Sequence, residues 1–142
     1  MTILHNILSA HDSTKIATDT GTKMHARLQH TDSTSSTDLA ERMFTNPTLR
    51  RLFDSASQTE VPIAGIINGR FISRRIDRIR INHTDKIIEI LDYKTDIAPE
   101  NYRTKYILQI REYANLVHKL YPDYKIICYI LWTHDFSLEQ IN

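Results

Sequence analysis

Two aspartates and a lysine occur in the middle of this chain in a pattern that could bind a metal ion. Asp77 lies in one predicted strand, and Asp92 and Lys94 lie two residues apart at the end of the next. Residues two apart on a strand project to the same side. Two carboxylates can hold a divalent cation, and an ammonium group beside them can stabilise a scissile phosphate or position the attacking water. The spacing therefore indicates a metal-dependent phosphodiesterase.

A solvated strand face with a cross-strand ion pair would give the same pattern, because acidic and basic residues alternate on many exposed strands. Asp92 differs from such a position, since Ile87, Ile88, Ile90 and Leu91 precede it. This apolar run is typical of a buried strand, and a carboxylate at its end needs a partner.

Other residues could complete the site. The backbone carbonyl of Tyr93 could add an oxygen ligand. His25 and Glu60 could add further donors, although a single histidine on a helix more often packs, and a single glutamate at a strand edge is more often solvated. Gln109 and Tyr113 share a helix face. A half-buried amide at Gln109 needs hydrogen-bond partners, whereas Tyr113 is equally compatible with a core position.

Basic residues are concentrated around Asp77. A basic strip attracts phosphate backbones with an affinity that depends on salt, and the same residues would equally suit a solvated sheet face. Arg75 and Arg78, next to Asp77, are the candidates for substrate binding or for support of the site. The strip consists of Arg70, Arg74, Arg75, Arg78 and Arg80.

The overall composition excludes several classes of protein. The 142 residues carry a net charge of +1, which gives no global nucleic-acid signature. A single cysteine, Cys128, excludes an intramolecular disulfide, a Cys-rich zinc site and a four-cysteine iron–sulfur cluster. No apolar run approaches the roughly 20 residues of a membrane span, and the first residues lack the features of a signal peptide. We expect a soluble, cytoplasmic protein without membrane association.

Apolar periodicity predicts the elements that must position these residues. Asn46-Pro47 marks a helix start, Asn68-Gly69 is a strong hairpin signal, and Pro122 ends a helix. Alternation along the second strand places Phe71, Asp77 and Ile79 on one face. The expected helices are residues 3–8, 21–30, 38–45, a segment from 46–47 onward and 102–121, and the expected strands are 61–67, 71–81, 86–94 and 124–132.

This order of elements predicts an α/β fold of the restriction-endonuclease-like type. A mixed sheet, made of an antiparallel meander and one strand after a crossover helix, would be flanked by helices. We expect one domain over residues 1–142, in which residues 1–55 are mainly helical and residues 60–133 form the sheet core.

Several segments together match, in order, the motifs of one known family. They are Gly21-Thr22-Lys23-Met24-His25, Asn46-Pro47 through Leu52-Phe53, Glu60-Val61-Pro62-Ile63, Arg75-Ile76-Asp77-Arg78-Ile79, Leu91-Asp92-Tyr93-Lys94-Thr95, Gln109-Ile110-Arg111-Glu112-Tyr113 and Leu131-Trp132-Thr133. The chain thereby resembles the C-terminal nuclease domain of RecB/AddA-type helicase–nucleases, within the PD-(D/E)XK nuclease superfamily. The likeness is closest to the AddA proteins of alphaproteobacteria.

The resemblance implies a Mg²⁺- or Mn²⁺-dependent DNA nuclease acting in repair or recombination. It implies that the catalytic residues are Asp77, Asp92 and Lys94, and that Gln109 and Tyr113 support the site and contact single- or double-stranded DNA. It also implies four metal ligands, namely His25, Asp77, Asp92 and the carbonyl of Tyr93.

The sequence also departs from the family pattern. The family usually has a glycine where Arg74 or Arg75 stands, and residues 29–45 form a shorter, more polar stretch than in relatives. The chain has no Gly-rich Walker loop, so a separate helicase subunit is the expected partner. Two alternatives stay open: a weak or inactive remnant that binds nucleic acid or docks a partner, and an RNA nuclease, since recognition of a 2′-OH leaves no short motif.

Overall fold

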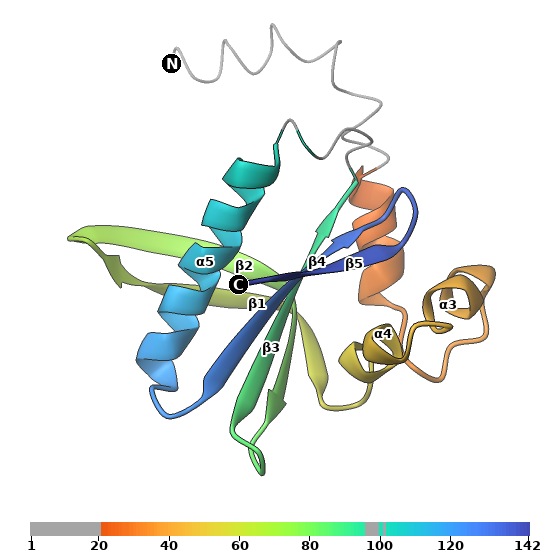
Figure 1. Ribbon diagram of the computed structural model, residues 1–142, viewed down its shortest axis with the longest axis horizontal. Coiled ribbons are helices and arrows are strands. Elements are labelled where there is room, and N and C mark those ends of the chain that lie inside the picture. The colour runs from red at the N-terminus through yellow and green to blue at the C-terminus, as the bar shows by residue number, and fades with distance from the viewer. Residues whose placement is uncertain (1–20, 96–99, 101) are drawn as a thin grey trace, which may run out of the picture.

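A five-stranded mixed sheet forms the centre of the computed structural model, which describes residues 21–95, 100 and 102–142 (Figure 1). The strands are β1 (Ser57–Ile67), β2 (Arg70–Asn82), β3 (Ile87–Lys94), β4 (Lys125–Trp132) and β5 (Ser137–Ile141). They lie in sequence order; β3 and β4 are parallel, and the other neighbours are antiparallel. This arrangement, with helices beside the sheet, confirms the predicted fold class.

The helices begin and end close to where the sequence predicted. Residues 21–29 are helical, and the other helices are α3 (Asp38–Met43), α4 (Pro47–Leu52) and α5 (Arg103–Leu120). The side chain of Asn46 caps α4 by accepting a hydrogen bond from the backbone N–H of Thr48. The helix predicted at residues 3–8 lies outside the described residues. In the part of the chain that the structure describes, no helix is long and apolar enough to span a membrane.

Two hydrophobic cores lie on opposite faces of the sheet. Helix α5 covers one face (Figure 1), where Ile110 packs with Ile90. The helix at 21–29, α3 and α4 cover the other face, where Leu28 packs with Leu91. Alternation along β3 therefore places Asp92, like Ile90, on the face that α5 covers.

Strand β2 does not keep one alternation along its length. The sequence placed Phe71 on the same face as Ile79, but Phe71 is 69% exposed, whereas Ile72, Ile76 and Ile79 all join the core beneath α5. The phase therefore shifts by one residue between Ile76 and Ile79. Glu60 lies opposite this shift with a φ of 54°. The prediction of a single alternating face was wrong because neither a glycine nor a proline marks the position.

The hairpin between β1 and β2 is confirmed, and one strand was not predicted. Asn68 and Gly69 have φ angles of 51° and 77°, the left-handed conformation that a tight hairpin turn needs. Figure 1 shows this hairpin extending away from the other strands. Strand β5 continues the sheet beyond β4, pairing Ser137 with Trp132. Its five residues carry only a short apolar pattern, so the sequence predicts a sheet that ends at residue 133.

Candidate functional site

The candidate site lies where β2 and β3 separate. Their pairing ends at Arg78 and Leu91, and the next residues beyond that pair are Asp77 and Asp92. The Oδ2 atom of Asp77 accepts a hydrogen bond of 2.8 Å from the backbone N–H of Tyr93. At the point where the strands separate, the Asp77 carboxylate thus takes the place of a backbone carbonyl as the acceptor for β3. Asp77 and Asp92 lie side by side, one residue beyond the last paired residues of the two strands.

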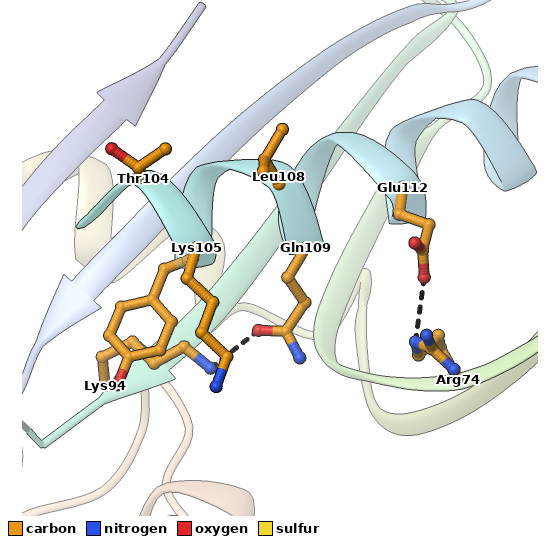
Figure 2. Close-up of a pocket in the computed structure, with 8 residues that line it drawn as sticks. Arg74, Lys94, Thr104, Lys105, Leu108, Gln109 and Glu112 are labelled. Atoms are coloured by element: carbon orange, nitrogen blue, oxygen red, sulfur yellow. Dashed lines mark hydrogen bonds and ion pairs between the residues drawn. The ribbon is translucent and has the colours of Figure 1, made fainter. Parts of the chain in front are cut away.

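Lys94 contacts three groups on this face of the sheet. Its Nζ lies 2.9 Å from Oδ2 of Asp92 and donates a hydrogen bond of 2.9 Å to Oε1 of Gln109. The same atom lies 4.6 Å from the centre of the Tyr106 ring. Figure 2 shows the Gln109 side chain reaching from α5 to Lys94. The ammonium group is therefore held in one place by β3 on one side and α5 on the other.

Burial and like charge act together on the two aspartates. The side chains of Asp77 and Asp92 are only 13% and 4% exposed. Burial, reinforced by the neighbouring Asp92 carboxyl, raises the pKa of Asp77 to about 8. Oδ2 of Asp92 lies 2.9 Å from Nζ of Lys94, so this carboxyl is paired with an ammonium group as well as lying beside Asp77. A proton on Asp77 or a bound cation would each relieve the repulsion between the carboxyls.

The helix at residues 21–29 brings His25 to the same place. Its Nδ1 lies 3.7 Å from Oδ1 of Asp77, and its Nε2 lies 3.2 Å from the carbonyl oxygen of Tyr93. The four ligands that the resemblance implies therefore lie together. In residues 21–95, 100 and 102–142, however, no three His, Cys, Asp or Glu side chains are arranged to hold a metal ion. The donors fit a hard cation that takes one or two carboxylates and keeps several waters.

Three further candidates lie around this centre. Glu60 lies between Thr59 and Val61, whose partners in β2 flank Asp77, and its carboxylate is 3.7 Å from Nη1 of Arg75. The Arg75 side chain is 69% exposed and can reach a ligand in solvent. Tyr113 lies on the buried face of α5; burial raises the pKa of its hydroxyl, and the charges of Asp92 and Asp77 add to that effect.

Arg78 is buried and supports the structure around the site. Its Nη2 donates to the carbonyl oxygens of Leu28 and Thr31, and its Nε donates to the hydroxyl of Tyr93. The guanidinium also lies over the Phe53 ring at 3.9 Å. These contacts join the end of the His25 helix to β3, so Arg78 is placed to support the site and not to bind a phosphate in solvent.

The arginines of β2 do not lie together in one basic strip. Arg78 is buried, and two further arginines are already paired with carboxylates. Arg80 forms an ion pair of 2.9 Å with Asp54, and Arg74 forms one of 2.9 Å with Glu112 of α5. Alternation and the phase shift in β2 distribute these arginines over both faces of the sheet. A strip would require all five arginines on one face of the sheet. Their positions include both odd and even numbers, so strand alternation alone already divides them between the two faces.

An open pocket beside Lys94 contains functional candidates that the sequence analysis missed. Its volume is about 770 Å³. Figure 2 shows it between α5 and β2. The sequence signal was present but weak, because Lys105 precedes Gln109 by one helical turn and so shares its face of α5. The lining residues are Arg74, Lys94, Thr104, Lys105, Tyr106, Leu108, Gln109 and Glu112.

Comparison with known proteins adds nothing to the geometry of the site. No protein-family model matches the chain, and no curated protein matches it significantly. The arrangement offers two buried carboxylates and a backbone carbonyl as oxygen ligands, with a lysine ammonium in contact with one carboxylate. Such a site can hold a hard cation and stabilise negative charge that develops beside it.

Proposed function

We propose that this chain is a Mg²⁺- or Mn²⁺-dependent nuclease that hydrolyses phosphodiester bonds of DNA. The observation that carries the proposal is Lys94, fixed between Asp92 and Gln109 at the point where Asp77 and Asp92 meet. The ordered motifs of the RecB/AddA-type nuclease domain support the same activity. A role in DNA repair or recombination, a cytoplasmic location and a separate helicase subunit as partner depend on that resemblance alone.

The cation would be held by Asp77, Asp92 and the carbonyl of Tyr93, with His25 as a further ligand. The two buried carboxyls support this assignment, because Asp77 and Asp92 lie close enough to raise the pKa of Asp77, and a cation between them would compensate their like charge. When bound, Mg²⁺ or Mn²⁺ would polarise a phosphate oxygen and lower the pKa of a coordinated water.

Lys94 supplies positive charge on the other side of the phosphate. An ammonium group has three N–H donors. Gln109 takes one, and the contact with Asp92 takes a second, which leaves one donor for a phosphate oxygen. Because the Tyr106 ring lies 4.6 Å from Nζ, the side chain has little room to turn away. The ammonium is thus preorganised to stabilise the charge that builds up during attack.

Cleavage of supercoiled plasmid and of single-stranded DNA tests the proposal. Wild type should cut with Mg²⁺ or Mn²⁺ and stop in chelator. Asp92→Asn and Lys94→Met should each lower the rate by about 100-fold or more, as expected for loss of a group that stabilises the transition state. Lys125→Ala, on the exposed start of β4, is the matched control and should keep full activity.

Two results would refute this activity: a folded wild type that cuts nothing, or full activity in both site variants. An RNA oligonucleotide of the same sequence belongs in the assay, and faster cleavage of RNA would assign the chain as an RNA nuclease.

A second candidate function is a module that binds nucleic acid without cutting it. It is favoured by the finding that the described His, Cys, Asp and Glu side chains do not form a three-ligand metal group. Calorimetric titration with Mn²⁺ separates the two functions. The nuclease requires Mn²⁺ binding that Asp92→Asn weakens, whereas the binding module requires none that depends on this carboxylate.

A further inference from the structure

The pocket beside Lys94 is positively charged. Arg74, Lys94 and Lys105 line it together with one carboxylate, Glu112. Glu112 is already paired with Arg74 at 2.9 Å, so its charge is compensated inside the pocket. Lys105 is exposed, and no described residue forms an ion pair with it. Figure 2 shows its side chain extending from α5 towards the pocket, where an anion could bind without breaking an existing ion pair.

An aromatic pair lies next to this charge. The ring of Tyr102 stacks on that of Tyr106, with the centroids 6.0 Å apart and the planes at 26°. Tyr106 lines the pocket and also contacts Trp132, which holds it from behind at 6.1 Å. Tyr102 is 48% exposed although its ring is large and mostly apolar. A flat exposed ring supported by a second ring is a surface on which a planar group can stack.

Stacking rings beside a basic groove are the combination that binds single-stranded nucleic acid. We propose, on the basis of the nuclease function above, that this pocket binds one nucleotide of an unpaired strand next to the cleaved bond. Lys105 contacts its phosphate, and the exposed ring of Tyr102 stacks on its base. A base in a duplex is already stacked on both sides, so the ring selects an unpaired strand, whereas Lys105 binds any phosphate.

The test measures binding and not cleavage. A short fluorescein-labelled DNA strand, and a hairpin duplex that contains the same sequence, are titrated in chelator while fluorescence anisotropy is recorded over a range of salt concentrations. Tyr102→Ala should weaken binding of the single strand about tenfold and leave binding of the duplex unchanged. Tyr102→Phe keeps the ring and should bind like wild type, which separates stacking from any loss of folding.

The salt series tests the role of Lys105. For single-stranded DNA, each neutralised phosphate contributes about 0.7 to the slope of log affinity against log salt. Lys105→Ala should reduce the slope by about this amount, and Lys105→Arg should restore it. Tyr102→Ala should leave the slope unchanged. Lys125→Ala again serves as the control, because it removes an exposed lysine at the start of β4, outside the pocket.

The outcomes separate this inference from the nuclease function. The subsite is excluded if wild type binds no single strand, if Tyr102→Ala weakens strand and duplex equally or changes neither, or if Lys105→Ala keeps the wild-type slope. If the predicted binding pattern is found but the protein cuts nothing, the subsite stands and the nuclease function fails. If the protein cuts DNA but these variants bind like wild type, only the subsite fails.

Discussion

Replacing Asp77 by asparagine should remove a pH dependence from the stability of the metal-free protein. In the folded state, burial and the neighbouring Asp92 raise the pKa of Asp77 from 3.8 to about 8. The folded protein therefore keeps a proton here that the unfolded chain has already lost at neutral pH. The stability associated with this proton is complete below pH 3.8 and is lost as the pH rises towards 8.

The magnitude follows from the proton balance. Between pH 5 and pH 7, the folded state holds about one more proton at Asp77 than the unfolded state, so the free energy of unfolding falls by about 1.4 kcal/mol per pH unit. Over that interval the loss is about 3 kcal/mol. Asp77→Asn keeps an oxygen that can accept the N–H of Tyr93 but cannot titrate. The variant should lack this slope and be more stable than wild type at pH 7.

Urea unfolding in chelator at a series of pH values measures the difference between the two proteins. Asp54→Asn is a control of opposite sign, because hydrogen bonds from Arg80 and from the backbone N–H of Ala56 outweigh burial and lower the pKa of Asp54. The stabilisation by the Asp54 carboxylate is present above the ordinary carboxyl pKa and is lost only in acid. Asp54→Asn should therefore lower the free energy of unfolding at pH 7 without changing its slope against pH between pH 5 and pH 7. Equal slopes in wild type and Asp77→Asn would disprove the charge coupling at the site.

Two further substitutions test how the site is supported. Arg78→Ala would leave the carbonyls of Leu28 and Thr31 without their buried donor, and should lower the free energy of unfolding by about 3–5 kcal/mol in urea titrations, whereas Arg75→Ala on the exposed face should change it by less than about 0.5 kcal/mol. A small effect of Arg78→Ala would mean that water replaces the guanidinium. Gly65→Ala would place a methyl group 2.9 Å from Leu116 of α5 and should cost about 1–3 kcal/mol in thermal unfolding, part of which a second change, Leu116→Val, should restore. An unchanged melting temperature would show that α5 can move away from β1 at little cost.

Local sequence patterns predicted most of the elements because each pattern is set by near neighbours. The apolar run of β3, the helical spacing of α5 and the Asn68-Gly69 turn each predicted an element that the structure contains within a few residues of the expected position. Strand β5 was missed because its edge position needs only a short apolar pattern. The burial of Arg78 was missed as well, since an arginine is usually exposed unless carbonyl oxygens at a helix end are brought to it.

The positions of Asp92 and Lys94 on one side of a strand follow from their spacing, because side chains on a strand alternate with a period of two. The groups around these two side chains come from distant parts of the chain, and the folded structure brings them together. It brings His25, 68 residues from Tyr93, to within 3.2 Å of that carbonyl, and it places Gln109 of α5 against the lysine. It also shifts the phase of β2 opposite Glu60. These contacts depend on strand register and on which face each helix covers, and no pattern of near neighbours encodes either.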